Sequence, residues 1–565
     1  FEAIDVTITD KAGGNNFAAT GTITATNDSP TNGGDDDEYG NYCTANPVIP
    51  LTAVFTNGNL TSTTVNRGSR GTLSIPPTGK WYFEYTAGNA YPMTGLQKDG
   101  GVTNTNGQVS VTLNLDYAGN AAKLYDNASV SGSYGATYGS GDVIGVACDA
   151  DAGTLTFYKN NSTQGVAKSS MDYSADTWFP HMHQFDTGTH SFNFGSVAFS
   201  YTPPSNHLAL STANLSTPAI INPEEHFHSQ IVAKSGTTTT FTLPDWITTY
   251  EYLIIIKNTS GSAEKWYWLN SLRGVNKYIS SDATTAEATD ANVYSRSGTT
   301  GTLGSTLTSG KSYLIEIHKA GLASATASNT TGSINTVATS ANTLSGFALV
   351  EYTGNQTAGA TIGHGLSVAP EYLFCKQMNA SDGNLDVFHV SLGGTKRLFL
   401  QTSSTVSTSA AAWNNTAPSS SVITLGDGFG TNKNTVTYMA YVWHGVDAYS
   451  SFGSYKGNNN SDGPMISASG SPANYFSKHT TSGESWWNIP SVIPGNEANT
   501  VQQRLRYDTT AASSVSASMK WDYLSNGVKI RSTNPAYNTS GALYVYGAWG
   551  GQPLTDGAIN QGRAR

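Results

Sequence analysis

Short stretches of alternating apolar and polar residues recur along the chain and predict β-strands. In residues 141–195 they predict an apolar, β-branched strand at 143–146, an alternating strand at 154–158 and a closing strand at 192–194. The first two strands are separated by 149–153, where Asp residues and a glycine are typical of a tight turn. The pattern therefore predicts antiparallel strands joined by short turns.

After residue 228 the pattern repeats. Each of three stretches contains an apolar strand that ends in lysine (251–257, 371–376 and 474–478) and, later, an aromatic-rich strand (312–318, 437–444 and 542–549). The interval from an earlier landmark to that lysine is 24, 24 and 23 residues (233 to 257, 352 to 376, 455 to 478). A period near 100 residues predicts three tandem β-sandwich modules, each with a Ser/Thr/Asn-rich middle such as 403–421 that we expect to form surface loops.

The composition narrows the class of protein. Charged residues make up 12 % of the chain, about half of the usual share of about 25 %, and hydroxyl and amide side chains take their place. Such a surface is typical of extracellular or virion β-proteins. The net charge of −10 argues against nucleic acid or an anionic membrane as the partner. No stretch approaches the length of a membrane-spanning apolar segment.

The N-terminal region predicts a small hairpin with strands at 4–9 and 20–25. The acidic run at 33–38 is expected to be a solvated linker. A metal at Asp35–Glu38 stays open as an alternative, although the run lacks the spacing of a known calcium loop. The chain begins with Phe1 and not with Met, which is compatible with a preceding segment.

The three cysteines, Cys43, Cys148 and Cys375, are far apart and odd in number. They predict buried thiols, with no disulfide framework and no zinc site.

Two histidine pairs could bind metal. In the run Glu224-Glu-His-Phe-His228, His226 and His228 would share one face of a strand, at a spacing compatible with zinc. A structural role is the preferred interpretation. For His181 and His183 we expect packing or a place in a ligand loop.

No catalytic constellation is evident, and we expect no enzyme activity and no cofactor. The paired carboxylates Asp149/Asp151 and Asp382/Asp386 fall in predicted turns, where Asp is favoured for backbone reasons. A polysaccharide depolymerase built as a β-helix would repeat every 20–25 residues or so, and that class is the least favoured one.

Aromatic residues are the better candidates for binding. Most of them alternate within predicted strands and are expected to be core. The candidates for loops that contact a ligand, through stacking on a sugar, are Trp413, Trp486 and Trp487.

Several motifs in order resemble a SPRY domain. They are Gly-Lys-Trp-Tyr-Phe-Glu-Tyr at 79–85, followed by GDVIGV, GTLTFYKN, WFP and FNFG within 141–195. The hairpin turn that is usually Asn-Gly is Asn160-Asn161 here. Asn can also adopt the left-handed backbone conformation that such a turn needs. The resemblance covers about 41–201. It implies a bent antiparallel β-sandwich that binds partners through its loops and carries no chemistry.

The remaining chain resembles structural proteins of tailed phages. Residues 212–220 resemble the segment that follows SPRY domains there, and 371–376 with 391–400 resemble units of marine-phage appendage proteins. The resemblance implies a virion appendage: a tail fibre, a spike or a head-decoration fibre. Its expected partners are other virion proteins and a host-surface glycan or protein, and its expected state is a homotrimer.

We therefore expect an all-β, multi-domain chain of antiparallel β-sandwiches. The predicted parts are an N-terminal hairpin and linker (1–40), a SPRY-like sandwich (41–203), an extended linker (204–227), module 1 (228–327), a linker (328–345), module 2 (346–446), module 3 (449–549) and a tail (550–565). The alternatives to host attachment are a purely architectural virion protein and a secreted bacterial adhesin or lectin.

Overall fold

A computed structural model describes residues 42–47, 54–63, 67–89, 91–98, 114–127, 129–173, 177–184, 187–468, 470–496 and 498–553. The chain forms two compact units. The first contains the residues up to Thr217 together with 462–466. The second holds nearly all of the chain from Pro218 to Pro553. The hairpin and the acidic run predicted within 1–40 lie outside the described residues, as does most of the predicted tail.

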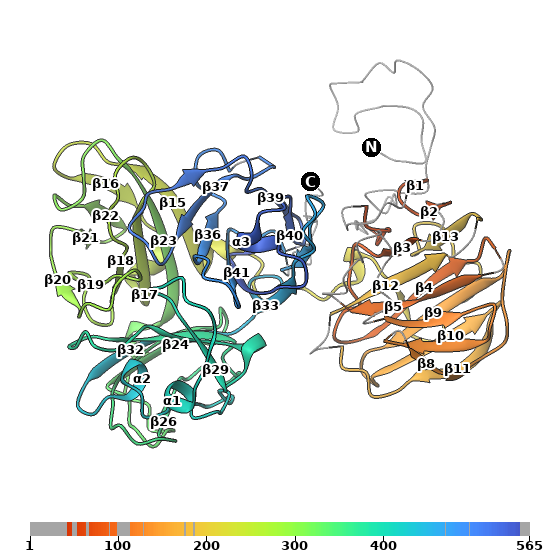
Figure 1. Ribbon diagram of the computed structural model, residues 1–565, viewed down its shortest axis with the longest axis horizontal. Coiled ribbons are helices and arrows are strands. Elements are labelled where there is room, and N and C mark those ends of the chain that lie inside the picture. The colour runs from red at the N-terminus through yellow and green to blue at the C-terminus, as the bar shows by residue number, and fades with distance from the viewer. Residues whose placement is uncertain are drawn as a thin grey trace, which may run out of the picture. The chain divides into compact units, whose positions relative to one another are not determined.

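The first unit contains two antiparallel sheets (Figure 1). The order of the larger sheet is β1 (Phe55–Thr56), β2 (Thr61–Ser62), β13 (His190–Asn193), β4 (Lys80–Thr86), β9 (Val143–Asp149), β10 (Thr154–Lys159) and β11 (Ser162–Lys168), with β14 (Leu208–Ala209) beside β4. The order of the other is β3 (Arg67–Arg70), β12 (Trp178–Gln184), β5 (Pro92–Lys98), β6 (Asn114–Ala118), β7 (Lys123–Asp126) and β8 (Ser129–Ser133).

The core of this unit follows from the alternation in the sequence. Phe83 on β4 lies opposite Val146 on β9, and Leu155 and Phe157 are the buried positions of β10. Together with Phe192 these side chains belong to one buried cluster. Because every second residue of a strand faces the same side, the alternating pattern in the sequence fixes which side chains enter the core.

The second unit contains three main sheets, which we call the first, second and third sheets. The first is ordered β15 (Phe227–Ala233), β23 (Ser312–Leu322), β17 (Tyr250–Asn258), β18 (Tyr267–Asn270), β19 (Lys277–Ile279), β20 (Ala288–Thr289). The second is ordered β24 (Ala338–Asn342), β25 (Phe347–Thr353), β32 (Thr437–Trp443), β27 (Tyr372–Gln377), β28 (Asp386–His389), β29 (Lys396–Phe399), β30 (Ser407–Thr408). The third is ordered β33 (Ser451–Lys456), β41 (Leu543–Trp549), β35 (Asn474–His479), β36 (Trp487–Pro490), β37 (Gln503–Arg506), β38 (Ser514–Val515).

Shorter elements complete the unit. They are the sheet of β16 (Thr239–Thr242), β22 (Thr300–Leu303) and β21 (Tyr294–Ser297), the pair β26 (Thr361–Gly363) and β31 (Val422–Thr424), the hairpin β39 (Trp521–Leu524) and β40 (Gly527–Ile530), and the helices α1 (Ala410–Trp413), α2 (Phe429–Asn432) and α3 (Pro535–Asn538).

The three sheets repeat one arrangement. In each of them the last strand in the chain lies between two earlier strands: β23 between β15 and β17, β32 between β25 and β27, and β41 between β33 and β35. A tyrosine near the start of that strand accepts a hydrogen bond from the backbone N–H five residues earlier. The three bonds are Thr308 to Tyr313 (2.7 Å), Lys433 to Tyr438 (2.8 Å) and Thr539 to Tyr544 (2.9 Å).

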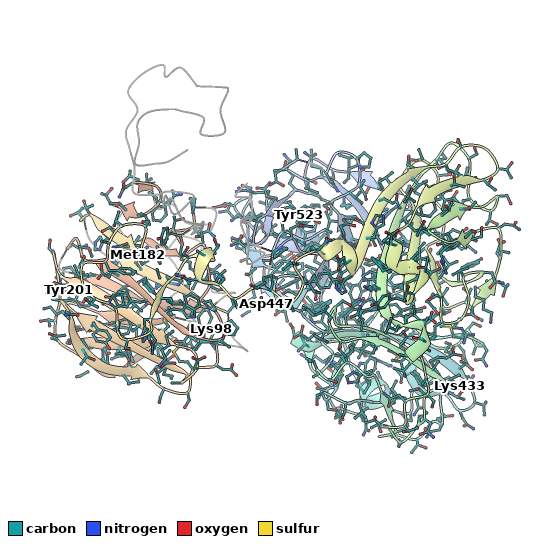
Figure 2. All side chains as sticks on the ribbon, turned by 180° about the vertical axis from the view of Figure 1, so that it is seen from behind. Lys98, Met182, Tyr201, Lys433, Asp447 and Tyr523 are labelled. Atoms are coloured by element: carbon teal, nitrogen blue, oxygen red, sulfur yellow. The ribbon has the colours of Figure 1, made fainter. Side chains whose placement is uncertain are left out.

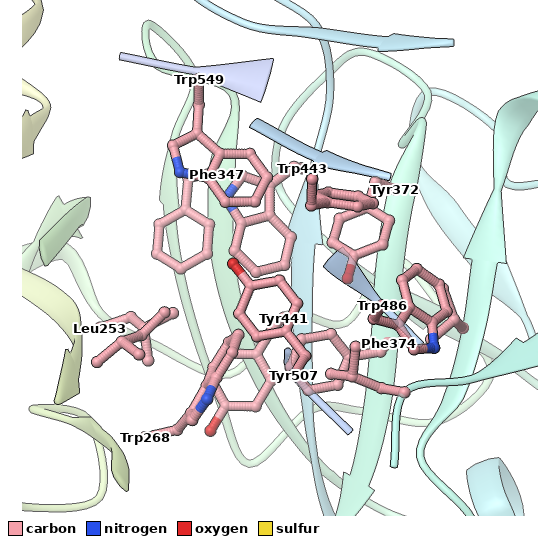
Figure 3. Close-up of a cluster of buried hydrophobic side chains, with 14 of the residues drawn as sticks. Leu253, Trp268, Phe347, Tyr372, Phe374, Tyr441, Trp443, Trp486, Tyr507 and Trp549 are labelled. Carbon is pink, nitrogen blue, oxygen red and sulfur yellow. The ribbon is translucent and has the colours of Figure 1, made fainter. Parts of the chain in front are cut away.

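The three sheets share one aromatic core (Figure 3). His318, Trp443 and Trp549 occupy the same position on β23, β32 and β41, since each lies opposite the same position of the second strand. Their ring centroids are 5.3 Å (His318–Trp549), 5.6 Å (His318–Trp443) and 6.0 Å (Trp443–Trp549) apart. Each sheet therefore buries its inner face against the other two.

The seams between sheets are also joined by polar groups. The Trp266 indole N–H of the first sheet donates to the Arg506 carbonyl of the third (2.9 Å), and that of Trp486 donates from the third sheet to the Phe399 carbonyl of the second (2.9 Å). The guanidinium of Arg273 joins the first and second sheets by bonding Glu351. Each pair of sheets is thus connected directly.

The first and last strands of this unit meet. Gly550 follows β41 with a positive φ of 68°. A Cβ atom added to it would lie 2.5 Å from Cδ1 of Phe227, the first residue of β15. Only glycine fits this contact without displacing the ring.

The prediction of an all-β chain with antiparallel sheets is confirmed. The strands predicted at 251–257, 371–376, 437–444, 474–478 and 542–549 are β17, β27, β32, β35 and β41. All three sheets lie within one compact unit, which is not divided further. The division of 228–549 into three separate domains therefore remains a prediction. The predicted linker 328–345 is wrong in part, since it contains β24, which pairs with β25.

The neighbouring residues Trp486 and Trp487 allow the seam bond to be measured. Both rings are buried, but the Trp487 indole N–H has no hydrogen-bond partner among the described residues. Trp486→Phe should lower the free energy of unfolding by about 1–3 kcal/mol more than Trp487→Phe, because it removes the donor of the hydrogen bond that joins the third sheet to the second. Urea unfolding of the two variants measures the difference, and equal losses would contradict the role of this bond.

Candidate binding surface and buried charged groups

The first unit exposes two edge strands close to each other. β8 and β11 end their respective sheets, and nearly all of their residues are exposed or partly exposed (Figure 1). The Tyr134 hydroxyl donates to the Gly165 carbonyl (2.6 Å), and the Ala136 N–H donates to the Gln164 side chain (2.8 Å). These bonds tie the chain after β8 to β11. We call residues 129–136 with 162–168 the edge surface.

The edge surface is rich in hydroxyl groups and low in charge. Val130 and Val166 are about half exposed (49 % and 58 %) among Ser, Thr, Gly and Gln side chains. Its lysine, Lys168, is paired with Asp126 (2.6 Å). Edge strands leave backbone N–H and C=O groups unpaired. Bulges and positive-φ glycines at 132 and 165 interrupt the regular pattern here. The surface can therefore offer hydrogen bonds and small apolar contacts to a neutral, polar partner.

The tryptophans predicted to contact a ligand are not on exposed loops. Trp413 ends α1 and packs in the core of the second sheet, with its ring edge-on to Phe388. Trp486 belongs to the shared core, and Trp487 lies in β36 beneath Arg504. All three are at most 7 % exposed, so the prediction is wrong. Polar residues beside them, Asn-Asn-Thr after Trp413 and Ser-Gly-Glu-Ser before Trp486, are typical of loops, whereas the rings themselves supply core volume.

The histidine pairs have separate protein partners. His181 Nδ1 is 2.9 Å from Asp116 inside the sandwich. His228 is 2.9 Å from Glu224, while the ring of His226 is edge-on to Tyr449. Burial lowers the pKa of His226 to about 4. Among the described residues, no group of three or more His, Cys, Asp and Glu side chains could hold a metal ion.

The predicted carboxylate pairs do not act together. Asp149 accepts from the Ala152 N–H (3.0 Å) and Asp151 from the Gly79 N–H (2.8 Å), so each of them fixes a turn. Asp382 is paired at the surface with Lys433, which Figure 2 labels. Asp386 is buried against Arg397 (3.0 Å), and burial raises its pKa to about 7.

The three cysteines are free and buried, as predicted. Burial raises the pKa of each thiol to about 12, and a protonated thiol is a poor nucleophile.

The lysines that end the apolar strand of each repeat have a function that the sequence pattern did not show. Lys257, Lys376 and Lys478 occupy the same position on β17, β27 and β35, and all three are fully buried. Each ammonium group reaches a backbone carbonyl of another sheet. Lys257 reaches Thr510 of the third sheet's segment (2.8 Å), Lys376 reaches Ala283 of the first (3.4 Å) and Lys478 reaches Ser403 of the second (2.9 Å).

These contacts run around a closed ring, from the first sheet to the third, the third to the second and the second to the first. Burial lowers the pKa of Lys257 and Lys478 to about 8 and that of Lys376 to about 7. Perturbed groups often mark functional sites. These three lie inside the unit, where each ammonium group donates a hydrogen bond to a backbone carbonyl oxygen of another sheet. This arrangement holds the sheets together.

Comparison with known proteins finds one family in each of the two compact units. The family described as "Domain of unknown function (DUF7483)" matches residues 222–553, more than half of the chain. The chain belongs to the DUF7483 family. Residues 80–196 match the SPRY domain family, so the predicted SPRY domain is confirmed and indicates a protein-interaction or binding module.

Among solved structures, the SPRY domain of human HERC1 is similar to this DUF7483 protein at 16 % identity over 26 % of this chain and 96 % of that one, with a TM-score of 0.23. The TRIM65 PSpry domain is similar at 15 % identity over 27 % and 92 % of the two chains, with a TM-score of 0.23. No curated protein matches the DUF7483 chain. None of its described helices is long and apolar enough to cross a membrane.

The buried Lys376 should make the free energy of unfolding depend on pH in the alkaline range. Its folded pKa of about 7 lies below its ordinary value of 10.5, so the unfolded chain binds the proton more tightly and stability rises as pH increases between these values. Lys376→Met should reduce this rise by up to about 1.4 kcal/mol per pH unit between pH 8 and 10. Urea unfolding across this range checks it.

The exposed Lys265 provides the control for this measurement. Lys265→Met should leave the slope of stability against pH unchanged. If Lys376→Met also leaves it unchanged, the buried lysine does not titrate as described.

Proposed function

We propose that the chain is a non-catalytic structural component of a tailed-phage particle, an appendage that attaches to the host surface. The observation that carries the proposal is a SPRY binding module, whose edge surface is nearly uncharged, followed by a DUF7483 unit whose three sheets share one core. The assignment to a phage particle rests on the resemblance of the repeated segments to marine-phage appendage proteins. The proposed location is the outside of the virion.

The proposed partner of the edge surface is a neutral host glycan or a glycan-bearing protein. Hydroxyl and amide groups with scattered small apolar side chains suit a ligand that is itself hydroxyl-rich, and a net charge of −10 disfavours nucleic acid. Single contacts of this kind are weak. Several copies in one particle, for which we propose a homotrimer, would raise the avidity.

Enzymatic activity is not part of the proposal. The strongly perturbed carboxyl and ammonium groups of the second unit, Asp386 and Lys376 among them, are buried and bonded to protein groups. A catalytic acid or base must instead reach its substrate within hydrogen-bond distance.

The particle assignment can be tested on phage particles purified from a culture that expresses this chain. We expect the chain in the particle proteome, and a cryo-EM map should show it projecting outward with the edge surface free. Absence from washed particles would overturn the virion role. An edge surface packed against capsid or tail protein would instead favour a purely architectural component.

The binding surface can be tested by adding one charge to it. Val166→Lys should weaken binding to immobilised host glycans or host cells by about tenfold or more, because the new ammonium must lose water on contact with a neutral ligand. Surface plasmon resonance or cell-binding fluorescence measures the loss.

Val197→Lys is the matched control for Val166→Lys. Val197 is also exposed (40 %) in the first unit but lies outside the edge surface, so its replacement should leave binding unchanged. Equal effects of the two changes, with both variants folded, would place the binding site elsewhere.

A further inference from the structure

Four polar side chains lie buried at the seam between the first and third sheets. They are Glu316 on β23, Asn474 on β35, Asn488 on β36 and Tyr507 just after β37, and none of them is more than 1 % exposed. The Glu316 Oε1 atom accepts a hydrogen bond from the Asn474 amide (2.7 Å). Burial, with the Glu316 carboxyl nearby, raises the pKa of Tyr507. We call these four residues the seam cluster.

Three polar atoms of the seam cluster lack a protein partner. Among the described residues, Glu316 Oε2 and both polar atoms of the Asn488 amide make no hydrogen bond, whereas the side chains of Tyr507 and Asn474 are hydrogen-bonded to each other. Buried polar groups in folded proteins are nearly always bonded, to protein or to ordered water. Leaving three such atoms dry at one place would cost a large part of the stability of a domain.

The fold does not require polar groups at these positions. The position of Asn488, opposite Phe476, is taken in the second sheet by Val387, opposite Phe374. The position of Asn474 is taken by Leu253 in the first sheet. Polar residues therefore replace apolar ones at this seam.

Other buried amides of the unit are fully bonded. The Asn538 side chain donates to the Asn460 carbonyl (2.7 Å) and the Ser532 carbonyl (2.6 Å) and accepts from the Asn458 N–H (2.8 Å). Unbonded amides are thus not a general feature of this unit, which leaves the seam cluster in need of a ligand.

We propose that the seam cluster is a binding site for ordered water molecules enclosed between the first and third sheets. Water can donate to Glu316 Oε2 and to Asn488 Oδ1 and can accept from the Asn488 N–H₂ group. A metal cation would satisfy the oxygen atoms but could not accept from the Asn488 N–H₂ group. The chemistry of the set therefore favours a ligand that both donates and accepts hydrogen bonds.

The sign of a stability change tests the proposal in the full chain. If water bonds the Asn488 amide, Asn488→Leu removes those bonds and should lower Tm by about 3–6 °C. The fully bonded Asn538 sets the scale, since Asn538→Leu should lower Tm by a similar amount. If the site is dry, Asn488→Leu replaces an unbonded amide with an apolar group, and an unchanged or raised Tm would overturn the proposal.

A crystal structure of the unmodified chain at high resolution provides the second measurement, which stands even if a variant fails to fold. The expected result is at least one water peak within hydrogen-bond distance of Glu316 Oε2 or of the Asn488 amide. Absence of density there would overturn the proposal. Anomalous scattering at the site after a rubidium soak would also overturn it, by assigning a cation in place of water.

Discussion

The second unit depends on the contact among His318, Trp443 and Trp549. These rings come from the last strand of each repeat, more than 100 residues apart in the chain, and they touch pairwise. Aromatic rings bury large areas, and here each ring buries its area against the two other sheets. A single sheet would expose that face to water, so the shared core makes each sheet depend on its neighbours.

Polar contacts give this apolar core a defined geometry. Stacked rings tolerate small shifts, whereas a hydrogen bond is lost within a fraction of an ångström. Trp266, Trp486 and the three buried lysines each reach a carbonyl of another sheet, and so set how far and at what angle the sheets approach. Burying an ammonium group is costly unless it is bonded, which explains why each lysine has a backbone oxygen in reach.

Much of the strand content could be predicted from the sequence. Alternation located β9 and β10, and the regular spacing of Lys257, Lys376 and Lys478 located β17, β27 and β35. The mutual packing of the three repeats could not be predicted, because alternation shows which face is buried but not what covers it. Trp486 was misassigned because its polar flanks outweighed one available signal: a tryptophan that follows the lysine by nine residues in the first repeat (Lys257, Trp266) and by eight in the third (Lys478, Trp486).

The contact between Phe227 and Gly550 has a mechanical consequence. The chain enters the second unit and leaves it at neighbouring points, so tension applied along the chain enters and exits at one place. Such a load would act on the contact between Phe227 of β15 and Gly550 before it reached the seams that involve the second sheet. A unit built in this way takes up tension at one point of its surface and not along its whole length.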